Sequence, residues 1–155
     1  MKKLLNSLFE AEHNTLTEKF KNLFTMLLIN LIWVVAVLQA YEFLLPEQGI
    51  RFVQERDTLQ VVFWSMISAP LWEELVFRYL PRKLGDQFPK LMLPLILCSS
   101  IMFGYIHNGV PSIWIQGFIG LSFFWLYMKN GSIYWTMVAH ALWNYIVIFG
   151  LQYLR

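Results

Sequence analysis

An almost entirely apolar stretch from Leu23 to Leu45 sets the strongest limit on what this chain can fold into. At 1.5 Å per residue, a helix of this length crosses the ~30 Å hydrocarbon core of a bilayer. The rest of the chain is similarly apolar, with 57% hydrophobic and 17% aromatic residues overall and a mean hydropathy of +0.50. Its 155 residues suffice for one domain. We therefore predict a single polytopic membrane domain over residues 1–155.

Four more apolar segments follow the first, separated by turn signals. They are expected at about 58–80, 90–107, 112–127 and 132–154, with turns at Asn108–Pro111 and Lys129–Gly131. Before them, residues 1–14 place apolar and polar side chains on opposite sides, which indicates a short helix lying in the membrane interface. The spacing of Thr15 and Glu18 matches a capping box and predicts the start of a long helix. The predicted fold class is all-α: a bundle of about five transmembrane spans, an N-terminal interfacial helix, and a motif-bearing core at 58–154.

The basic residues favour one orientation in the membrane. If the N-terminus is inside, the inner side holds Lys2, Lys3, Lys19, Lys21, Arg82, Lys83, Lys90 and Lys129, and the outer side Arg51, Arg56 and Arg155. The positive-inside rule then predicts a cytoplasmic N-terminus.

The net charge of +2, without a basic stripe, argues against a nucleic-acid partner, and the single Cys98 excludes disulfides. Acidic residues interrupt the first apolar run, so we expect no cleaved signal peptide.

Two adjacent carboxylates and an arginine stand within the segment expected at 58–80. Ionisable groups at bilayer depth are costly unless they are paired or face a polar cavity, so they mark a functional site by default. Glu74 and Arg78 are four residues apart on one helix face, which predicts a structural ion pair, whereas Glu73 points elsewhere. Glu73 would then be free to act as a base. The structural alternative is that both glutamates pair with Arg78 and Lys83 and hold helices together.

Two later segments each contribute a histidine. His107 ends the segment expected at 90–107, where a merely interfacial role is common. His140 lies about nine residues into the last segment, between apolar flanks, and Asn144 follows one turn later on the same face. An imidazole and a carboxamide stacked in this way can donate hydrogen bonds to one developing oxyanion. Interhelical hydrogen bonding is the structural alternative.

A free carboxylate and two histidines from three segments converge only if those helices pack together. Such a set can activate a water molecule by general base catalysis. It can also bind a divalent metal such as zinc through Glu73, His107 and His140, leaving one position open. The order of the residues does not choose between the two. The helical His-Glu-x-x-His zinc motif and the Gly-x-Ser-x-Gly nucleophile motif are absent from the sequence.

Taken in order and spacing, three motifs resemble those of the CPBP family of intramembrane proteases. They are Glu73-Glu-x-x-x-Arg78, Phe103-x-x-x-His107 and His140-x-x-x-Asn144. The family includes CAAX prenyl endopeptidases of the Ras-converting-enzyme type and bacterial Abi proteins. The resemblance covers the second to fifth expected spans. It implies that Glu73 and His107 activate water, that His140 and Asn144 form the oxyanion hole, and that no metal cofactor is needed.

A membrane endopeptidase is therefore the leading functional hypothesis. Its partners would be the lipid bilayer and a peptide or protein substrate with a prenylated or other apolar part, in a bacterial or archaeal cell membrane. The alternative is a non-catalytic Abi-type immunity or scaffold protein, which would use the polar cluster for helix packing or partner binding. A transporter with a proton relay is a third hypothesis, disfavoured because no internal repeat is visible.

Counting along straight helices sets Glu73 and His107 apart. At 1.5 Å per residue, Glu73 lies about 24 Å from the outer start of its span and His107 about 25 Å from the inner start of its own. In a core of ~30 Å, the two side chains would fall on opposite sides of the midplane. Pro70 has no N–H to donate to the carbonyl of Met66, which predicts a kink in the helix just before Glu73. Such a kink is one way to close this gap.

Overall fold

The computed structural model describes residues 14–44 and 58–150 of the chain. The interfacial helix predicted at 1–14 lies almost wholly outside these ranges, as does the loop at 47–57. Every regular element in the described part is helical, which confirms the predicted all-α fold.

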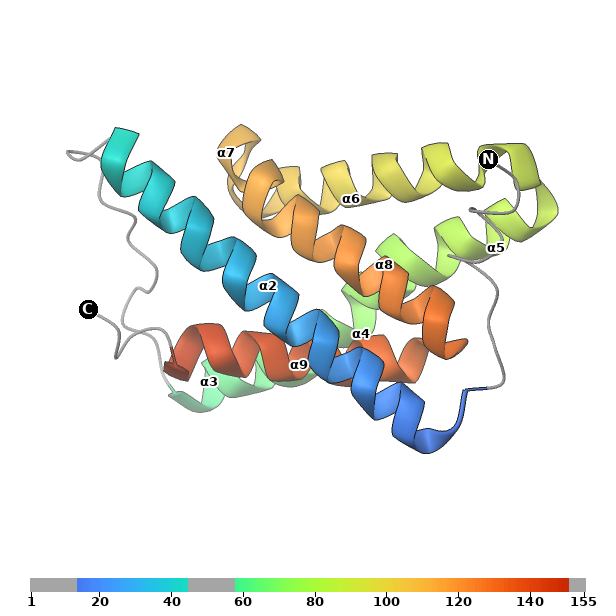
Figure 1. Cartoon of the computed structure of the whole chain (residues 1–155), viewed down its shortest axis with the longest axis horizontal. Helices are drawn as coiled ribbons and strands as arrows, with labels where there is room; N and C mark the ends of the chain where they lie inside the picture. Colours follow the sequence, from blue (N-terminus) through green and yellow to red (C-terminus); the bar gives the residue numbers. More distant parts are fainter. Residues whose placement is uncertain (1–13, 45–57, 151–155) are drawn as a thin grey trace.

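The first described helix, α2 (Leu16–Leu44), begins at the predicted capping box. The backbone N–H of Thr15 donates to Oε2 of Glu18 over 2.6 Å, and the N–H of Glu18 donates to Oγ1 of Thr15 over 3.3 Å. These two bonds satisfy donors that the helix start leaves without partners. From there α2 crosses the bundle diagonally, over α9 and beside α8 (Figure 1).

The glutamate pair lies on a continuous helical run from Thr58 to Gln87, which we call the motif helix. It consists of α3 (Thr58–Val62), the π-helical turn η1 (Phe63–Ser68), α4 (Ala69–Glu74), the π-helical turn η2 (Leu75–Tyr79) and α5 (Leu80–Gln87). Both α4 and α5 carry a proline at their second residue, and both follow a π-helical turn. Such turns within α-helices are frequent at functional sites.

The chain after the motif helix reverses direction at two turns, one after α6 and one after α8. Its elements are the 3₁₀ turn η3 (Pro89–Leu91), α6 (Met92–Asn108), α7 (Val110–Ser112), the π-helical turn η4 (Ile113–Gly117), α8 (Phe118–Asn130), α9 (Ile133–Tyr145) and the π-helical turn η5 (Ile146–Gly150). Both predicted turns are present: Gly109 and Gly131 follow α6 and α8 with φ of 72° and 65°. Positive φ suits glycine, because it has no Cβ to clash with the backbone.

Four helices in the described part are long and apolar enough to cross a membrane. They are Leu16–Tyr41, Pro89–Asn108, Val110–Asn130 and Ile133–Gly150. The segment expected at 58–80 is not among them, since it belongs to the motif helix with its buried charges. The motif helix instead packs against α6, α8 and α9. Of these, α6 and α9 bring His107 and His140 to it.

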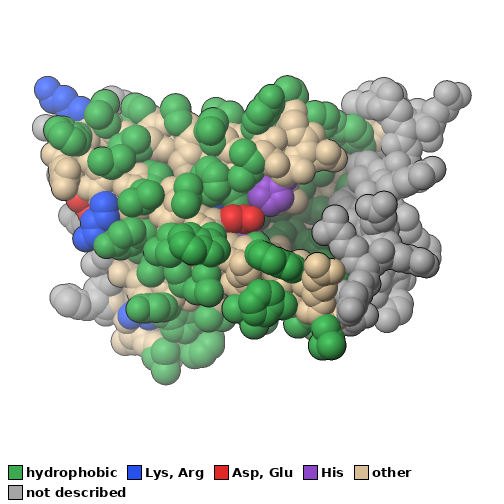
Figure 2. Space-filling view, turned by 180° about the vertical axis from the view of Figure 1, so that it is seen from behind, with side chains coloured by type: hydrophobic (Ala, Val, Ile, Leu, Met, Phe, Trp, Pro, Cys, Tyr) green, Lys and Arg blue, Asp and Glu red, His purple; other side chains and the backbone are tan. Residues whose placement is uncertain are grey.

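The hydrophobic core lies where α2, α8 and α9 meet. Phe123 and Leu126 of α8 pack there with Met26 of α2 and Trp143 of α9, all at 2% exposure or less. Many other large hydrophobic side chains point outward, and they are spread over the described part of the face seen in Figure 2. An outward apolar belt of this extent is suited to contact with lipid tails.

Candidate active site

The two adjacent glutamates of α4 enter different surroundings. Glu74 is fully buried, and its Oε2 lies 3.5 Å from Nε of Arg78, one turn along the chain. The Glu73 side chain keeps 24% exposure. Because neighbouring helical residues differ by about 100° in direction, one carboxylate faces the bundle interior and the other its edge.

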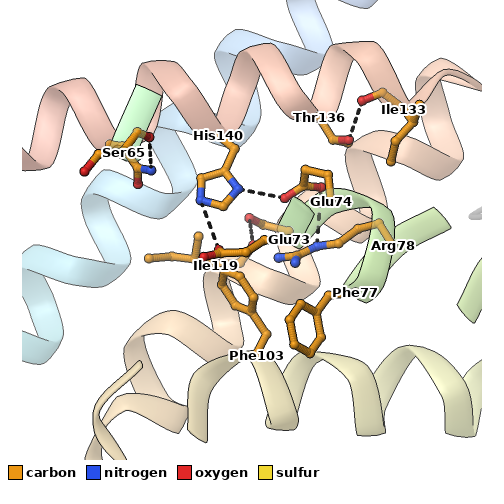
Figure 3. Close-up of polar contacts among 12 residues, drawn as sticks. Ser65, Glu73, Glu74, Phe77, Arg78, Phe103, Ile119, Ile133, Thr136 and His140 are labelled. Carbon is orange, nitrogen blue, oxygen red and sulfur yellow. Dashed lines mark hydrogen bonds and ion pairs between the residues drawn. The ribbon is translucent and has the colours of Figure 1, made fainter. Parts of the chain in front are cut away.

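Arg78 is held by Glu74 and by two aromatic rings. Its guanidinium carbon lies 4.0 Å from the ring centroid of Phe103 and 5.5 Å from that of Phe123. None of its nitrogens has a hydrogen-bond acceptor within the described residues, so Glu74 and the rings provide its stabilisation. Cations over aromatic faces gain more when water is excluded. Figure 3 shows Phe77 and Phe103 beside the arginine, on the side away from α9.

His140 of α9 lies between the two carboxylates (Figure 3). Its Nδ1 is 2.8 Å from Oε1 of Glu74, and its Nε2 is 3.6 Å from Oε2 of Glu73. An ionised carboxylate only accepts hydrogen bonds, so Nδ1 carries the proton in the bond to Glu74. Nε2 then faces Glu73, and it can donate only when the ring is an imidazolium.

His107, near the end of α6, approaches Glu73 from another side. Its Nε2 lies 3.8 Å from Oε2 of Glu73, and its Nδ1 is 2.7 Å from the carbonyl oxygen of Phe103. A carbonyl accepts but cannot donate, so Nδ1 is protonated here and the lone pair of Nε2 faces Glu73 in the neutral ring. The His107 side chain keeps 28% exposure.

The straight-helix count that placed Glu73 and His107 on opposite sides of the midplane is wrong. Oε2 of Glu73 is within 4 Å of both histidines. A π-helical turn uses more residues per turn than an α-helix, so η1 shortens the path from Thr58 to Glu73. The helices are also inclined to one another (Figure 1), whereas the count assumed that they run along a common axis.

Asn144 makes an interhelical hydrogen bond, as in the structural alternative for the last motif. Its Nδ2 donates over 2.7 Å to the backbone carbonyl of Ser65 in η1, one turn along α9 from His140. This carboxamide therefore binds the backbone of the motif helix.

A family model for the Rce1-like type II CAAX prenyl endopeptidases matches residues 55–146, more than half of the chain. The chain belongs to this Rce1-like family. The match begins just before the motif helix and ends within η5, so it includes Glu73, His107, His140 and Asn144. No curated protein and no solved structure matches the chain. The family and the four apolar helices together identify an integral membrane protein of the CAAX protease type.

Several residues around this Rce1-like site were not singled out from the sequence. Phe103 contributes its ring to Arg78 and its carbonyl to His107, and the ring of Phe123 lies 5.0 Å from that of His140. Ser99 of α6 donates its hydroxyl to the carbonyl of Phe77. Phe103 stands in the second motif, so the sequence did hold a signal for it. Phe123 and Ser99 carry none, because apolar and small residues are common in membrane helices.

The zinc alternative required Glu73, His107 and His140 as ligands. In residues 14–44 and 58–150, no group of three or more histidine, cysteine or acidic side chains could hold a metal ion. We therefore derive no step of the reaction through a metal.

Proposed function

We propose that this Rce1-like protein is an intramembrane endopeptidase in which Glu73 activates the attacking water. The observation that carries the proposal is the position of Oε2 of Glu73. This atom is buried, has no hydrogen-bond partner within the described residues, and faces Nε2 of His107 and of His140. The distances of 3.8 and 3.6 Å exceed hydrogen-bond length, and a polar gap of this size suits a bridging water.

The proposed reaction follows from the hydrogen-bonding capacity of each group. A water between Glu73 and His107 can donate one hydrogen to Oε2 and the other to Nε2. Glu73 takes the proton as the water oxygen attacks the peptide carbonyl, and it later returns the proton to the leaving nitrogen. The imidazolium form of His140, supported by Glu74 at Nδ1, would donate from Nε2 to the oxyanion.

The substrate has to reach this site from the membrane. Glu73 and His107 are partly exposed, and Figure 2 shows an acidic and a histidine side chain together near the middle of the face, with hydrophobic side chains around them. Exposed apolar side chains such as Trp72, Val76 and Ile106 are close to them along the chain. We propose a peptide or protein substrate with a prenylated or similarly apolar part, reached from the lipid side.

The test is cleavage of a prenylated CAAX-type peptide by purified protein in detergent or liposomes, with products identified by mass spectrometry. Glu73→Gln keeps the shape and removes the base, so we expect at least a ~10²-fold loss of kcat. Asp86→Asn, in the exposed pair with Arg82, serves as the matched carboxylate control and should stay active. Undiminished cleavage by Glu73→Gln would refute the proposal.

The same variants distinguish the proposed peptidase from the non-catalytic alternative. If a cellular phenotype of the protein survives Glu73→Gln, the polar cluster serves packing or partner binding instead. Turnover that persists in chelator-treated protein without bound metal would support the proposed cofactor-free reaction, and turnover restored only by added zinc would contradict it.

A further inference from the structure

The motif helix lacks a backbone donor just before the glutamates. The N–H of Ala69 donates to the carbonyl of Trp64, five residues back, as in a π-helix. In that register, the next donor would be residue 70 and its acceptor the carbonyl of Ser65. Residue 70 is proline and has no N–H. The π-helical turn therefore moves the missing bond from Met66, where an α-helix would place it, to Ser65.

Asn144 supplies the donor that Pro70 cannot. Its Nδ2 lies 2.7 Å from the Ser65 carbonyl oxygen, at a partly buried position. A backbone carbonyl left without a donor at membrane depth is costly. The carboxamide removes that cost and fixes α9 against the motif helix eight residues before Glu73.

A second proline stands on the other side of the glutamates. The N–H of Leu80 donates to the carbonyl of Leu75, again five residues back. Residue 81 is the next proline, so the bond it cannot make is to the carbonyl of Val76 in the π-helical register and to that of Phe77 in the α-helical register. The hydroxyl of Ser99 on α6 donates to the Phe77 carbonyl. A polar side chain from a neighbouring helix thus bonds to the carbonyl five residues before Pro70 and to the carbonyl four residues before Pro81.

Each of these donors belongs to a helix that also carries a histidine of the site. Asn144 and His140 are on α9, and Ser99 and His107 are on α6. The gaps flank Glu73 and Glu74, so each histidine helix is fixed to the motif helix close to the carboxylates it faces.

We propose that Asn144 and Ser99 are positioning residues, which replace the backbone donors lost at Pro70 and Pro81 and thereby set the distances of His140 and His107 from Glu73. For Asn144, this role differs from donation to the oxyanion. The consequence for catalysis rests on the proposed peptidase function, whereas the replacement of backbone donors does not.

Double-mutant cycles on thermal unfolding of the full chain in detergent test the replacement itself. Pro70→Ala restores an N–H at residue 70, so Asn144→Ala should lower the unfolding midpoint by less than about half as much in that background as in the wild type. Ser99→Ala should behave in the same way with Pro81→Ala. The crossed pairs, Asn144→Ala with Pro81→Ala and Ser99→Ala with Pro70→Ala, are the matched controls and should be additive.

Two further outcomes are informative. Ser122→Ala removes a hydroxyl that bonds within its own helix, to the carbonyl of Ile119, and should couple to neither proline. Additive losses in both the Asn144–Pro70 cycle and the Ser99–Pro81 cycle would overturn the proposal. The two cycles are independent, so if one proline variant does not fold, the other still decides.

Cleavage of the prenylated peptide then tests positioning. Asn144→Ala should lower kcat, and the Pro70→Ala background should recover most of that loss. A backbone N–H at residue 70 can replace the hydrogen bond to the Ser65 carbonyl, but it cannot replace a donor to the oxyanion. Coupled stability with no recovery of kcat would assign Asn144 to the reaction itself and overturn its positioning role. Coupled stability in a protein without any cleavage activity would instead count against the peptidase function.

Discussion

Nδ1 of His140 lies 2.8 Å from Oε1 of Glu74, so the second glutamate of the motif binds a histidine as well as an arginine. Glu74 is shared between Arg78 through one oxygen and His140 through the other. The carboxylate that balances a buried charge also sets the tautomer of the ring that faces Glu73. The buried ion pair and the proposed catalytic groups are therefore linked through one side chain.

This link predicts opposite effects for the two adjacent glutamates. Glu74→Gln removes the paired carboxylate of the buried Arg78, and removing one partner of a buried ion pair costs about 3 to 5 kcal/mol. Glu73→Gln should change the free energy of unfolding by less than about 1 kcal/mol, because the side chain is partly exposed and Oε2 of its carboxylate lacks a hydrogen-bond partner within the described residues. Denaturant titration of both variants in the same detergent measures the difference. Equal stability of the two would contradict the assigned roles.

Arg78→Lys should destabilise the protein although the charge is kept. The flat guanidinium lies over the Phe103 ring at 4.0 Å from its centroid, and the ammonium of lysine cannot stack in this way. We expect a loss of about 1 to 2 kcal/mol in the free energy of unfolding. Phe103→Leu removes the ring, so in that background the same substitution should cost measurably less. An undiminished cost would show that the ring does not stabilise the arginine.

Gly104 allows α6 to approach η4. A Cβ at residue 104 would lie 2.7 Å from Cα of Ile113 and 2.8 Å from the backbone nitrogen of Gly117, which cannot move aside as a side chain can. Gly104→Ala should therefore cost about 2 kcal/mol of stability and reduce cleavage, because His107 is one turn further along α6. Gly150→Ala is the control: its nearest neighbour is a side-chain carbon at 3.8 Å, so stability should not fall. Equal unfolding midpoints for the two variants would refute this explanation of Gly104.

The predicted orientation can be tested by cysteine labelling in a Cys98→Ser background. The start of α2, α5 and the end of α8 lie toward one end of the bundle (Figure 1), and they carry most of the described basic residues. With the N-terminus in the cytoplasm, Gln87→Cys at the end of α5 should react with an impermeant maleimide only in inverted vesicles. Asn108→Cys, at the opposite end of its span, should react only from outside. The reverse pattern would require the opposite orientation.

The sequence by itself determined what depends on residues close together in the chain. The apolar runs predicted an all-α membrane protein, the Thr15–Glu18 spacing predicted a helix start, and the turns were expected where Gly109 and Gly131 adopt positive φ. Motif order was enough to indicate the family. These features follow from local periodicity and backbone sterics, which neighbouring residues specify.

Only the tertiary structure decided how the helices are offset along one another. The π-helical turn η1 and the inclination of the helices bring Glu73 to His107, although a count at 1.5 Å per residue separates them. The contacts of Glu74 with His140 and of Asn144 with Ser65 join residues more than sixty positions apart. Spacing within one helix does not encode such partners, because they depend on which carbonyls the prolines leave free and on which neighbouring helix can reach them.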